Sequence, residues 1–239
     1  MPIYRLTKEL VFPPPEGASD EGVVAIGGDF SPERLVLGYS QGIFPWPIDG
    51  LPLLWFSPDP RFVLPPRAAH LSRSLRKSIR RDTYEVRADT AFADVLRECA
   101  DAPRPGQEGT WITDELREGY EDLFDLGFAH SIEAWRDDEL VGGLYGVSIG
   151  RAFFGESMFA TEPDASKVAF ATLLGNLAAW EFDVVDCQVH TAHLERFGAR
   201  DVPREDYLRV LRRAIAAPTR RGHWTLPLDP IAAAALIPR

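Results

Sequence analysis

The chain has 239 residues, 45% of them hydrophobic, and carries a formal net charge of −10 at pH 7. This composition is that of a folded globule and excludes a disordered tail, and the length allows one large domain or two modest ones. No apolar run approaches the ~20 residues of a membrane span, and the first residues do not form a signal segment. Cys99 and Cys187 are isolated, so we expect a soluble cytoplasmic protein with no metal site and no disulfide framework.

Positive charge is concentrated in one segment despite the negative total. Residues 61–87 contain eight Arg or Lys and two acids, a local charge of +6 that leaves −16 for the rest of the chain. Such a patch indicates contact with nucleic acid, and an ordinary solvated helix surface is the alternative. The basic residues that share one face of the expected helix are Arg76, Lys77, Arg80 and Arg81.

The first part of the chain is rich in proline and aromatic residues. After a Pro-rich lead, residues 22–28 predict a short strand or turn. Ser31 and Pro32 predict the start of a helix that stops at Gly42. Aromatic residues in 43–47 and 54–60 are fixed by prolines, and they either fill a core or line a pocket. We expect residues 1–62 to form a small N-terminal domain.

Residues 63–239 predict a second, larger domain with a Pro-punctuated C-terminal tail. The expected helices are 72–81, one capped by Asp89, 113–127, 164–179, one near Leu194 and 203–216. The expected strands are 129–136, 140–149, 151–159 and 182–189, the first two joined as a hairpin by the polar turn 137–139. This order resembles the GNAT (N-acetyltransferase-like) fold, so the expected class is α+β. Acyl-CoA members of that fold bind phosphates on a glycine-rich loop before a long helix, and the corresponding stretch 156–161 has no such glycines.

The strand 182–189 ends in polar residues. Because side chains alternate across a strand, Asp186 and Gln188 are expected on one face and Cys187 on the other. Burying a carboxylate and an amide is costly unless they have hydrogen-bond partners or a task. The spacing leaves two interpretations, a hydrogen-bonded strand end or a functional pair.

A series of motifs in fixed order covers nearly the whole chain. They are Gly27-Gly28-Asp29, Gly42-Ile43-Phe44-Pro45-Trp46, Ser57-Pro58-Asp59-Pro60-Arg61, His70-Leu71-Ser72-Arg73-Ser74, Thr110-Trp111-Ile112, Ala129-His130-Ser131-Ile132-Glu133, Gly142-Gly143-Leu144-Tyr145-Gly146, Gly155-Glu156-Ser157-Met158-Phe159, Ala165-Ser166-Lys167 and Asp186-Cys187-Gln188. Together they resemble the leucyl/phenylalanyl-tRNA–protein transferase family. Two departures are Trp55-Phe56, where two tryptophans are usual, and Leu144, where methionine is common.

The resemblance implies an aminoacyltransferase that moves Leu or Phe, and Met less well, from aminoacyl-tRNA to the N-terminal Arg or Lys of a protein. The product carries a degradation signal. The implied partners are Leu-tRNA and Phe-tRNA as donors and proteins or peptides with N-terminal Arg or Lys as acceptors, with no cofactor, metal or membrane. Two other classes stay open, a CoA-dependent GNAT acetyltransferase and a non-catalytic RNA-binding protein with a structural Asp186 and Gln188.

The resemblance also implies roles for individual residues. Asp186 and Gln188 position and activate the attacking amine. The cationic side chain of the acceptor needs a negative partner, for which Glu156 is the candidate and Asp186 the alternative. The apolar pocket for the transferred side chain is expected to consist of Leu144, Phe153, Met158 and Val185. Trp46 and Trp111 are expected to stack on the terminal adenosine, an interaction worth ~1–3 kcal/mol per base. The basic helix is expected to contact tRNA phosphates.

Overall fold

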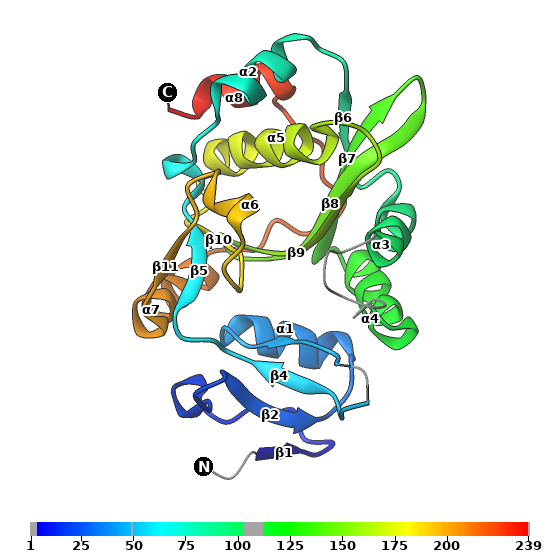
Figure 1. Ribbon diagram of the computed structural model, residues 1–239. Helices are drawn as coiled ribbons and strands as arrows, with labels where there is room; N and C mark the ends of the chain where they lie inside the picture. Colours follow the sequence, from blue (N-terminus) through cyan, green and yellow to red (C-terminus); the bar gives the residue numbers. More distant parts are fainter. Residues whose placement is uncertain (1–3, 49, 103–111, 239) are drawn as a thin grey trace.

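The computed structural model describes residues 4–48, 50–102 and 112–238, and these form two β-sheets with helices packed on them (Figure 1). The protein is a mixed α/β structure. The first sheet, called the N-terminal sheet, has the strand order β1-β2-β4-β3. Its strands are β1 (Tyr4–Leu6), β2 (Val23–Gly27), β3 (Phe44–Pro45) and β4 (Leu54–Phe56).

The helix α1 (Pro32–Ser40) lies between the N-terminal sheet and the rest of the chain (Figure 1). The Ser31-Pro32 start signal and the strand expected in 22–28 are confirmed. The aromatic segments have both of the expected uses. Phe44 and Trp55 are buried in the core, whereas Trp46 lines a cavity described below.

The second sheet, called the large sheet, has the strand order β11-β5-β10-β9-β8-β7-β6 among the described residues. Its strands are β5 (Arg61–Leu64), β6 (Glu85–Ala88), β7 (Ala129–Arg136), β8 (Glu139–Ile149), β9 (Ala152–Ala160), β10 (Val184–Asp186) and β11 (Arg200–Val202). The hairpin of β7 and β8 is confirmed, and Asp137 and Asp138 at its turn both have positive φ, as a tight primed turn requires.

Helices cover both faces of the large sheet. The remaining helices are α2 (Arg73–Arg80), α3 (Phe92–Asp101), α4 (Asp114–Asp125), α5 (Ala165–Ala179), α6 (Ala192–Glu195), α7 (Arg204–Ile215) and α8 (Pro230–Leu236), with the 3₁₀ turns η1 (Pro15–Gly17) and η2 (Pro66–Ala68). The expected helices that start at Ser72 and Thr113 are present as α2 and α4, and each of these two residues is an N-cap that accepts a hydrogen bond from a backbone N–H three residues on.

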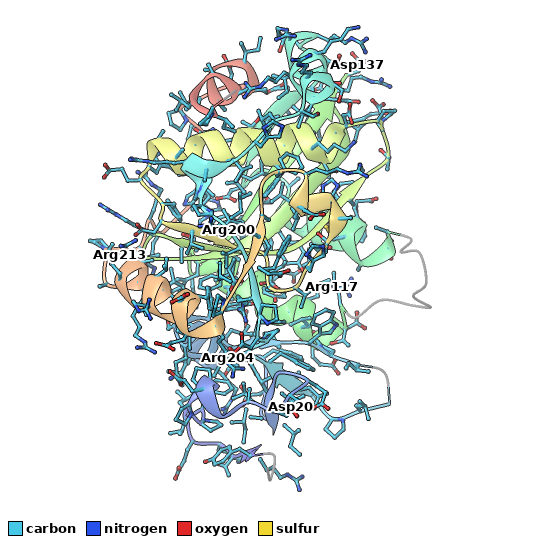
Figure 2. All side chains as sticks on the ribbon, turned by 60° about the vertical axis from the view of Figure 1, so that its left-hand side comes forward. Asp20, Arg117, Asp137, Arg200, Arg204 and Arg213 are labelled. Carbon is cyan, nitrogen blue, oxygen red and sulfur yellow. The ribbon has the colours of Figure 1, made fainter. Side chains whose placement is uncertain are left out.

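Two distinct apolar clusters each include residues of the large sheet. One contains residues of α2, α5 and the C-terminal segment. The other contains residues of α3, α4 and α7 together with α1 and the N-terminal sheet. Because this second cluster runs through both sheets, the expected domain boundary after residue 62 stays a prediction. Charged side chains such as Asp20, Asp137 and Arg213 project outward from these layers (Figure 2).

The strands β9 and β10 are parallel neighbours joined by α5, and they separate toward their ends. Their register runs from Val184 opposite Ala152 to Asp186 opposite Phe154. Beyond that point β9 continues to Ala160, whereas the backbone N–H of Cys187 bonds to Phe62 of β5 instead. This separation opens the sheet at its centre, next to the polar residues that the sequence analysis singled out.

Two features differ from the sequence-based expectations. The tail after residue 218 contains α8, which packs on α5. Asp89 does not cap α3, because its carboxylate accepts hydrogen bonds from the backbone of Ser131 and Trp224 and contacts Nδ1 of His130. The backbone N–H groups before α3 bond instead to the buried carboxylate of Glu133.

Trp224 fastens the C-terminal segment to the large sheet, since it is 4% exposed and stacks on His130 with ring centroids 3.8 Å apart. We expect Trp224→Ala to lower the free energy of unfolding by about 3–5 kcal/mol, because a large buried ring is lost. Ile231→Ala on α8, at a side chain 46% exposed, should change it by less than about 0.5 kcal/mol. Urea unfolding measures both, and equal small effects would show that the segment is not part of the cooperative fold.

Candidate active site

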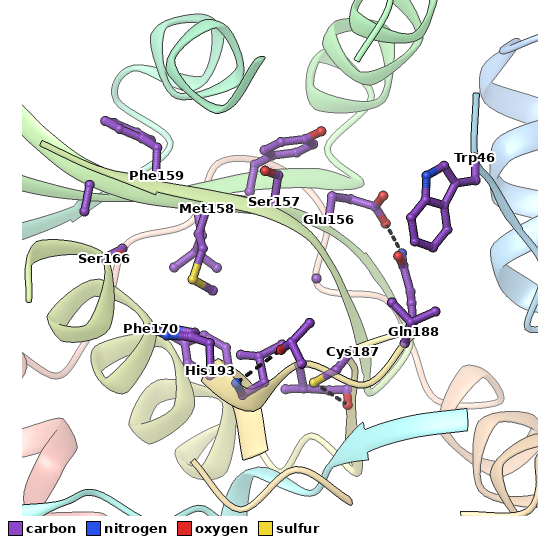
Figure 3. A pocket seen from close by; sticks show the side chains of 18 of the residues that line it. Trp46, Glu156, Ser157, Met158, Phe159, Ser166, Phe170, Cys187, Gln188 and His193 are labelled. Carbon is purple, nitrogen blue, oxygen red and sulfur yellow. Dashed lines mark hydrogen bonds between the residues drawn. The ribbon is translucent and has the colours of Figure 1, made fainter. Parts of the chain in front are cut away.

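A cavity of about 440 Å³ lies where β9 and β10 separate (Figure 3). Its wall comes from β8 and β9, the start of α5, residues 185–194 and the segment that contains Trp46. The lining residues are Pro45, Trp46, Leu144, Tyr145, Gly155, Glu156, Ser157, Met158, Phe159, Ala160, Ser166, Phe170, Val185, Cys187, Gln188, Val189, Thr191, His193 and Leu194. Most of these side chains are apolar, and the acidic group and the amide lie together at the end where Trp46 is (Figure 3).

Glu156 is the extra residue of a β-bulge. Gly155 pairs with Gly146 and Ser157 pairs with Tyr145, so Glu156 has no partner of its own on β8. A Cβ at Gly146 would lie 2.2 Å from the carbonyl oxygen of Phe154, so a glycine is required there. Bulges redirect a side chain out of the regular alternation of a strand. This bulge turns the carboxylate of Glu156 toward the helices α1 and α4.

Three side chains donate hydrogen bonds to the carboxylate of Glu156. Tyr39 of α1 donates at 2.8 Å, Tyr120 of α4 at 2.7 Å and Nε2 of Gln188 at 2.9 Å. The hydroxyls of Tyr39 and Tyr120 are themselves 2.7 Å apart. Glu156 of β9 is therefore connected to α1, to α4 and to the segment after β10, and these three contacts fix its orientation.

Burial raises the pKa of Glu156 to about 7, with the Asp186 charge acting in the same direction, while the hydrogen bonds from Tyr120 and Tyr39 oppose the shift. The contacts among the oxygens of Glu156, Tyr39 and Tyr120 also favour the protonated form of Glu156. Each tyrosine hydroxyl has one proton, so the two hydroxyls can donate to an ionised Glu156 only if the contact between them has no proton. A protonated Glu156 supplies it by donating to one hydroxyl, which then donates to the other. The carboxyl is thus able to change charge near neutral pH.

Gln188 is the second residue after β10 and has a φ of +64°. A non-glycine residue in the left-handed region is uncommon and is often held there at a functional position. This conformation ends the strand alternation, so Cys187 and Gln188 both line the cavity, and the expectation of opposite faces is wrong. With Nε2 bound to Glu156, the amide carbonyl oxygen is the acceptor that Gln188 can offer to a substrate N–H.

Asp186 is fully buried and is not among the described residues that line the cavity. Its carboxylate receives two hydrogen bonds from Arg61, at 2.8 and 2.6 Å, and one from Tyr207 at 2.7 Å. It also accepts the backbone N–H of Gln188 at 2.9 Å. Burial opposes the charge of Arg61, but the Asp186 carboxylate outweighs it and raises the Arg61 pKa. Removing the Asp186 carboxylate would leave Arg61 with a buried, unpaired charge, so we expect that change to destabilise the fold.

The structure brings most of the expected pocket residues to the cavity. Leu144, Met158 and Val185 line it, and Met158 points into its middle (Figure 3). Phe153 is fully buried in the apolar cluster that also contains Leu144 and Val185, and it is not among the described lining residues. Trp46 lines the cavity and lies beside Gln188 (Figure 3). Trp111 lies outside the described residues.

The basic helix α2 forms as predicted, but its cations differ in their surroundings. The guanidinium of Arg76 donates to the carbonyl oxygens of Ala234, Ile237 and Pro238. Arg76 is therefore bound to the C-terminal segment, and its expected phosphate contact stays a prediction. The other three residues of the predicted set, Lys77, Arg80 and Arg81, have exposed side chains.

Sequence reasoning missed four residues that hold the site: Tyr39, Arg61, Tyr120 and Tyr207. Tyr39 and Tyr120 are on the buried sides of α1 and α4, where a tyrosine is indistinguishable from ordinary core. Arg61 is the last residue of the motif 57–61, but its partner Asp186 is 125 residues away in the sequence. Among the described residues no group of three or more His, Cys, Asp or Glu is arranged to hold a metal ion, and no helix is long and apolar enough to cross a membrane.

Comparisons with known proteins cover nearly the whole chain. The sequence model of the leucyl/phenylalanyl-tRNA protein transferase family matches residues 63–212, and that of the family's N-terminal domain matches residues 28–59. A leucyl/phenylalanyl-tRNA–protein transferase of Myxococcus xanthus is 60% identical over 227 residues, which are 94% of this chain and 97% of the relative. One from Anaeromyxobacter sp. is 57% identical over 226 residues, 95% and 96% of the two chains. One from Nitratidesulfovibrio vulgaris is 54% identical over 230 residues, 96% and 98% of the two chains. The chain therefore belongs to the leucyl/phenylalanyl-tRNA protein transferase family.

Proposed function

We propose that the protein transfers Leu or Phe, and Met less well, from aminoacyl-tRNA to the N-terminal Arg or Lys of a protein or peptide. The observation that carries the proposal is the apolar cavity with Glu156 and Gln188 hydrogen-bonded at one end. An apolar side chain fits the cavity, and a cation with a neighbouring amine fits its polar end. The family membership supplies the donor, and a donor of this kind makes the cytoplasm the proposed location.

The reaction forms an amide bond and breaks an ester bond. The neutral α-amine of the acceptor attacks the carbonyl carbon, the C–N bond forms, and the 3′ oxygen of the tRNA leaves. The amine loses a proton, and the leaving oxygen gains one. An amide is not a base at neutral pH, so Gln188 acts by accepting an N–H hydrogen bond that orients the amine.

The two substrates are proposed to bind at opposite ends of the cavity. The transferred side chain lies among Leu144, Met158 and Val185, where the flexible methionine accommodates both branched and aromatic groups. The cationic side chain of the acceptor lies against Glu156. Trp46 offers a ring on which the terminal adenine stacks.

Asp186 is proposed as a positioning residue. It does not reach the cavity, but it accepts the backbone N–H of Gln188 and so holds that residue in its left-handed conformation. Arg61 and Tyr207 keep the carboxylate in place.

A GNAT-like fold for the large sheet is supported by the parallel pair β9 and β10, which separates at the site, and by the connecting helix α5. A CoA-dependent reaction and RNA binding without catalysis are the alternatives. The deciding experiment supplies labelled Leu-tRNA or Phe-tRNA, and separately acetyl-CoA, with a peptide that begins with Arg. Peptide labelling from the tRNA alone is expected. Acetylation, or tRNA binding without labelling, would overturn the proposal.

Glu156 should make acceptor binding depend on pH. Its pKa of about 7 means that the carboxyl becomes anionic as the pH rises through neutrality. The KM for an Arg-initiated peptide should therefore fall between pH 6 and 8, roughly one unit on either side of that pKa. Glu156→Gln should raise the KM at pH 8 by about tenfold or more, the size of one lost charged hydrogen bond, and should remove this pH dependence.

Steady-state kinetics with both proteins measure this effect. The acceptor's own amine titrates in each profile, so the difference between them isolates Glu156. A change confined to the KM for aminoacyl-tRNA would move Glu156 to the donor side.

Substitutions of Gln188 and of Asp186 should differ in how much they lower the free energy of unfolding. Gln188→Ala should lower kcat/KM by about 10²-fold, because the amine loses its orienting partner, and should lower the free energy of unfolding by about 1–2 kcal/mol, because buried Glu156 loses one hydrogen bond. Asp186→Ala should lower the free energy of unfolding by about 3–5 kcal/mol, because Arg61 is left charged and buried. Urea unfolding and transfer assays check both, and a fully stable Asp186→Ala protein would contradict the buried pair.

The exposed cations of α2 should contribute to tRNA affinity. Lys77→Gln combined with Arg80→Gln should weaken tRNA binding and reduce the slope of log K against log[salt] by roughly one per lost phosphate contact. Arg76→Gln is the matched control, because its guanidinium is occupied by carbonyl oxygens of the C-terminal segment. It should lower the Tm and leave the salt slope unchanged. Filter binding at several salt concentrations measures the slopes, and equal slopes in all proteins would assign the helix to ordinary surface.

A further inference from the structure

A second hollow, of about 370 Å³, lies beside the cavity. The proposed reaction as described above assigns it no role. It is lined by His70, Ser72, Ser74, Leu75, Asp164, Lys167, His193, Arg196 and Phe197. Four of these nine residues belong to two motifs that have no role in the proposed reaction, His70–Ser74 and Ala165–Lys167. We call it the basic hollow.

The charges around the basic hollow favour an anion. Lys167 and Arg196 bring two cations, and Asp164 brings one carboxylate. That carboxylate is already engaged, since it receives Nζ of Lys167 at 2.7 Å and the hydroxyl of Ser78 at 2.8 Å. The positive charge of Arg196 is not cancelled in this way by any ion pair found among the described residues.

Helix ends and neutral donors add to this preference. The first turns of α2 and α5 both lie at the hollow, and the N-terminus of a helix attracts negative charge. The hydroxyls of Ser72 and Ser74 are 3.0 Å apart at its wall. Nε2 of His193 is shielded from solvent and has no hydrogen-bond partner in the described part of the chain.

The position of the basic hollow links two surfaces that the donor is proposed to touch. His193 lines both the hollow and the cavity, and Ser166 and Lys167, adjacent on α5, line one each. On its other side the hollow is bounded by the first turn of α2. A nucleic-acid strand that runs from the cavity to Lys77 and Arg80 therefore passes the hollow.

We propose that the basic hollow binds a phosphodiester group of the single-stranded 3′ end of the donor tRNA, with Lys167 and Arg196 as its cationic contacts. This inference rests on the proposed function. It assigns a positioning role, since the phosphate is remote from the ester that reacts. The site would distinguish a donor that carries phosphates from the same aminoacyl group on adenosine alone.

Three donors test the proposal: phenylalanyl-tRNA, the phenylalanyl trinucleotide CCA, which has phosphodiesters, and phenylalanyl-adenosine, which has none. The double variant Lys167→Gln with Arg196→Gln should raise the KM about tenfold or more for the first two, since charge-assisted hydrogen bonds are lost. It should leave kcat, and the KM for phenylalanyl-adenosine, unchanged. For the trinucleotide the slope of log KM against log[salt] should fall by about 0.7, the single-strand value for one bound phosphate.

Two control proteins complete the experiment. Lys8→Gln, at an exposed lysine of the N-terminal segment, should behave as the unmodified protein with every donor. Lys167→Arg with Arg196→Lys, which keeps both charges, should restore most of the affinity for the trinucleotide.

The possible outcomes distinguish a failure of the basic-hollow proposal from a failure of the proposed function. Unmodified protein that uses all three donors, with a loss in the double variant confined to the phosphate-bearing ones, supports the proposal. An equal loss with phenylalanyl-adenosine, or no loss with any donor, overturns the basic hollow alone. Unmodified protein that transfers from none of the three overturns the proposed function together with it.

Discussion

The buried pair of Arg61 and Asp186 is the interaction on which the site depends. It joins β5 to β10, and the Arg61 guanidinium lies between the rings of Phe44 from the N-terminal sheet and Tyr207 from α7. A buried ion pair contributes little net stability, because desolvation offsets most of the attraction, but breaking one partner is costly. Its value here is geometric. The carboxylate also holds the backbone of Gln188, so the end of β10 is placed by contacts from both sheets.

Glu156 shows how a strand can supply a group whose charge changes near neutral pH. The bulge directs its carboxylate toward two buried tyrosines, and burial makes ionisation unfavourable, while the hydroxyls and the Gln188 amide limit that cost. A cation that binds next to it replaces the missing counter-charge and favours the ionised form. In the proposed reaction that cation is the side chain of the acceptor, so its binding and the release of the Glu156 proton would be coupled, with the helix α1 taking part through Tyr39.

Much of the local structure follows from short-range signals in the sequence. Ser72 and Thr113 start their helices as N-caps, and the Asp137-Asp138 turn closes the hairpin of β7 and β8. The ordered motifs likewise indicate Glu156 and Gln188, which the structure brings within 2.9 Å of each other. The burial of Asp186 was not predictable, because its partner Arg61 is distant in the chain and the alternation rule fails at a residue with positive φ. The helix α8 was missed because its short alanine run has no polar face to mark a period.

The C-terminal segment has a consequence for the order in which the chain folds during synthesis. Asn176 in the middle of α5 exchanges hydrogen bonds with the backbone of Leu228, a Cβ at Gly175 would lie 2.6 Å from the Cβ of Ala233, and Arg76 binds carbonyl oxygens as late as Pro238. One face of the large sheet therefore stays incomplete until the ribosome has synthesised these residues. The N-terminal sheet and α1 emerge long before, and domains generally fold as units in order of synthesis. A nascent chain stalled before residue 224 would expose the apolar side of α5, and chaperones would be expected to bind it there.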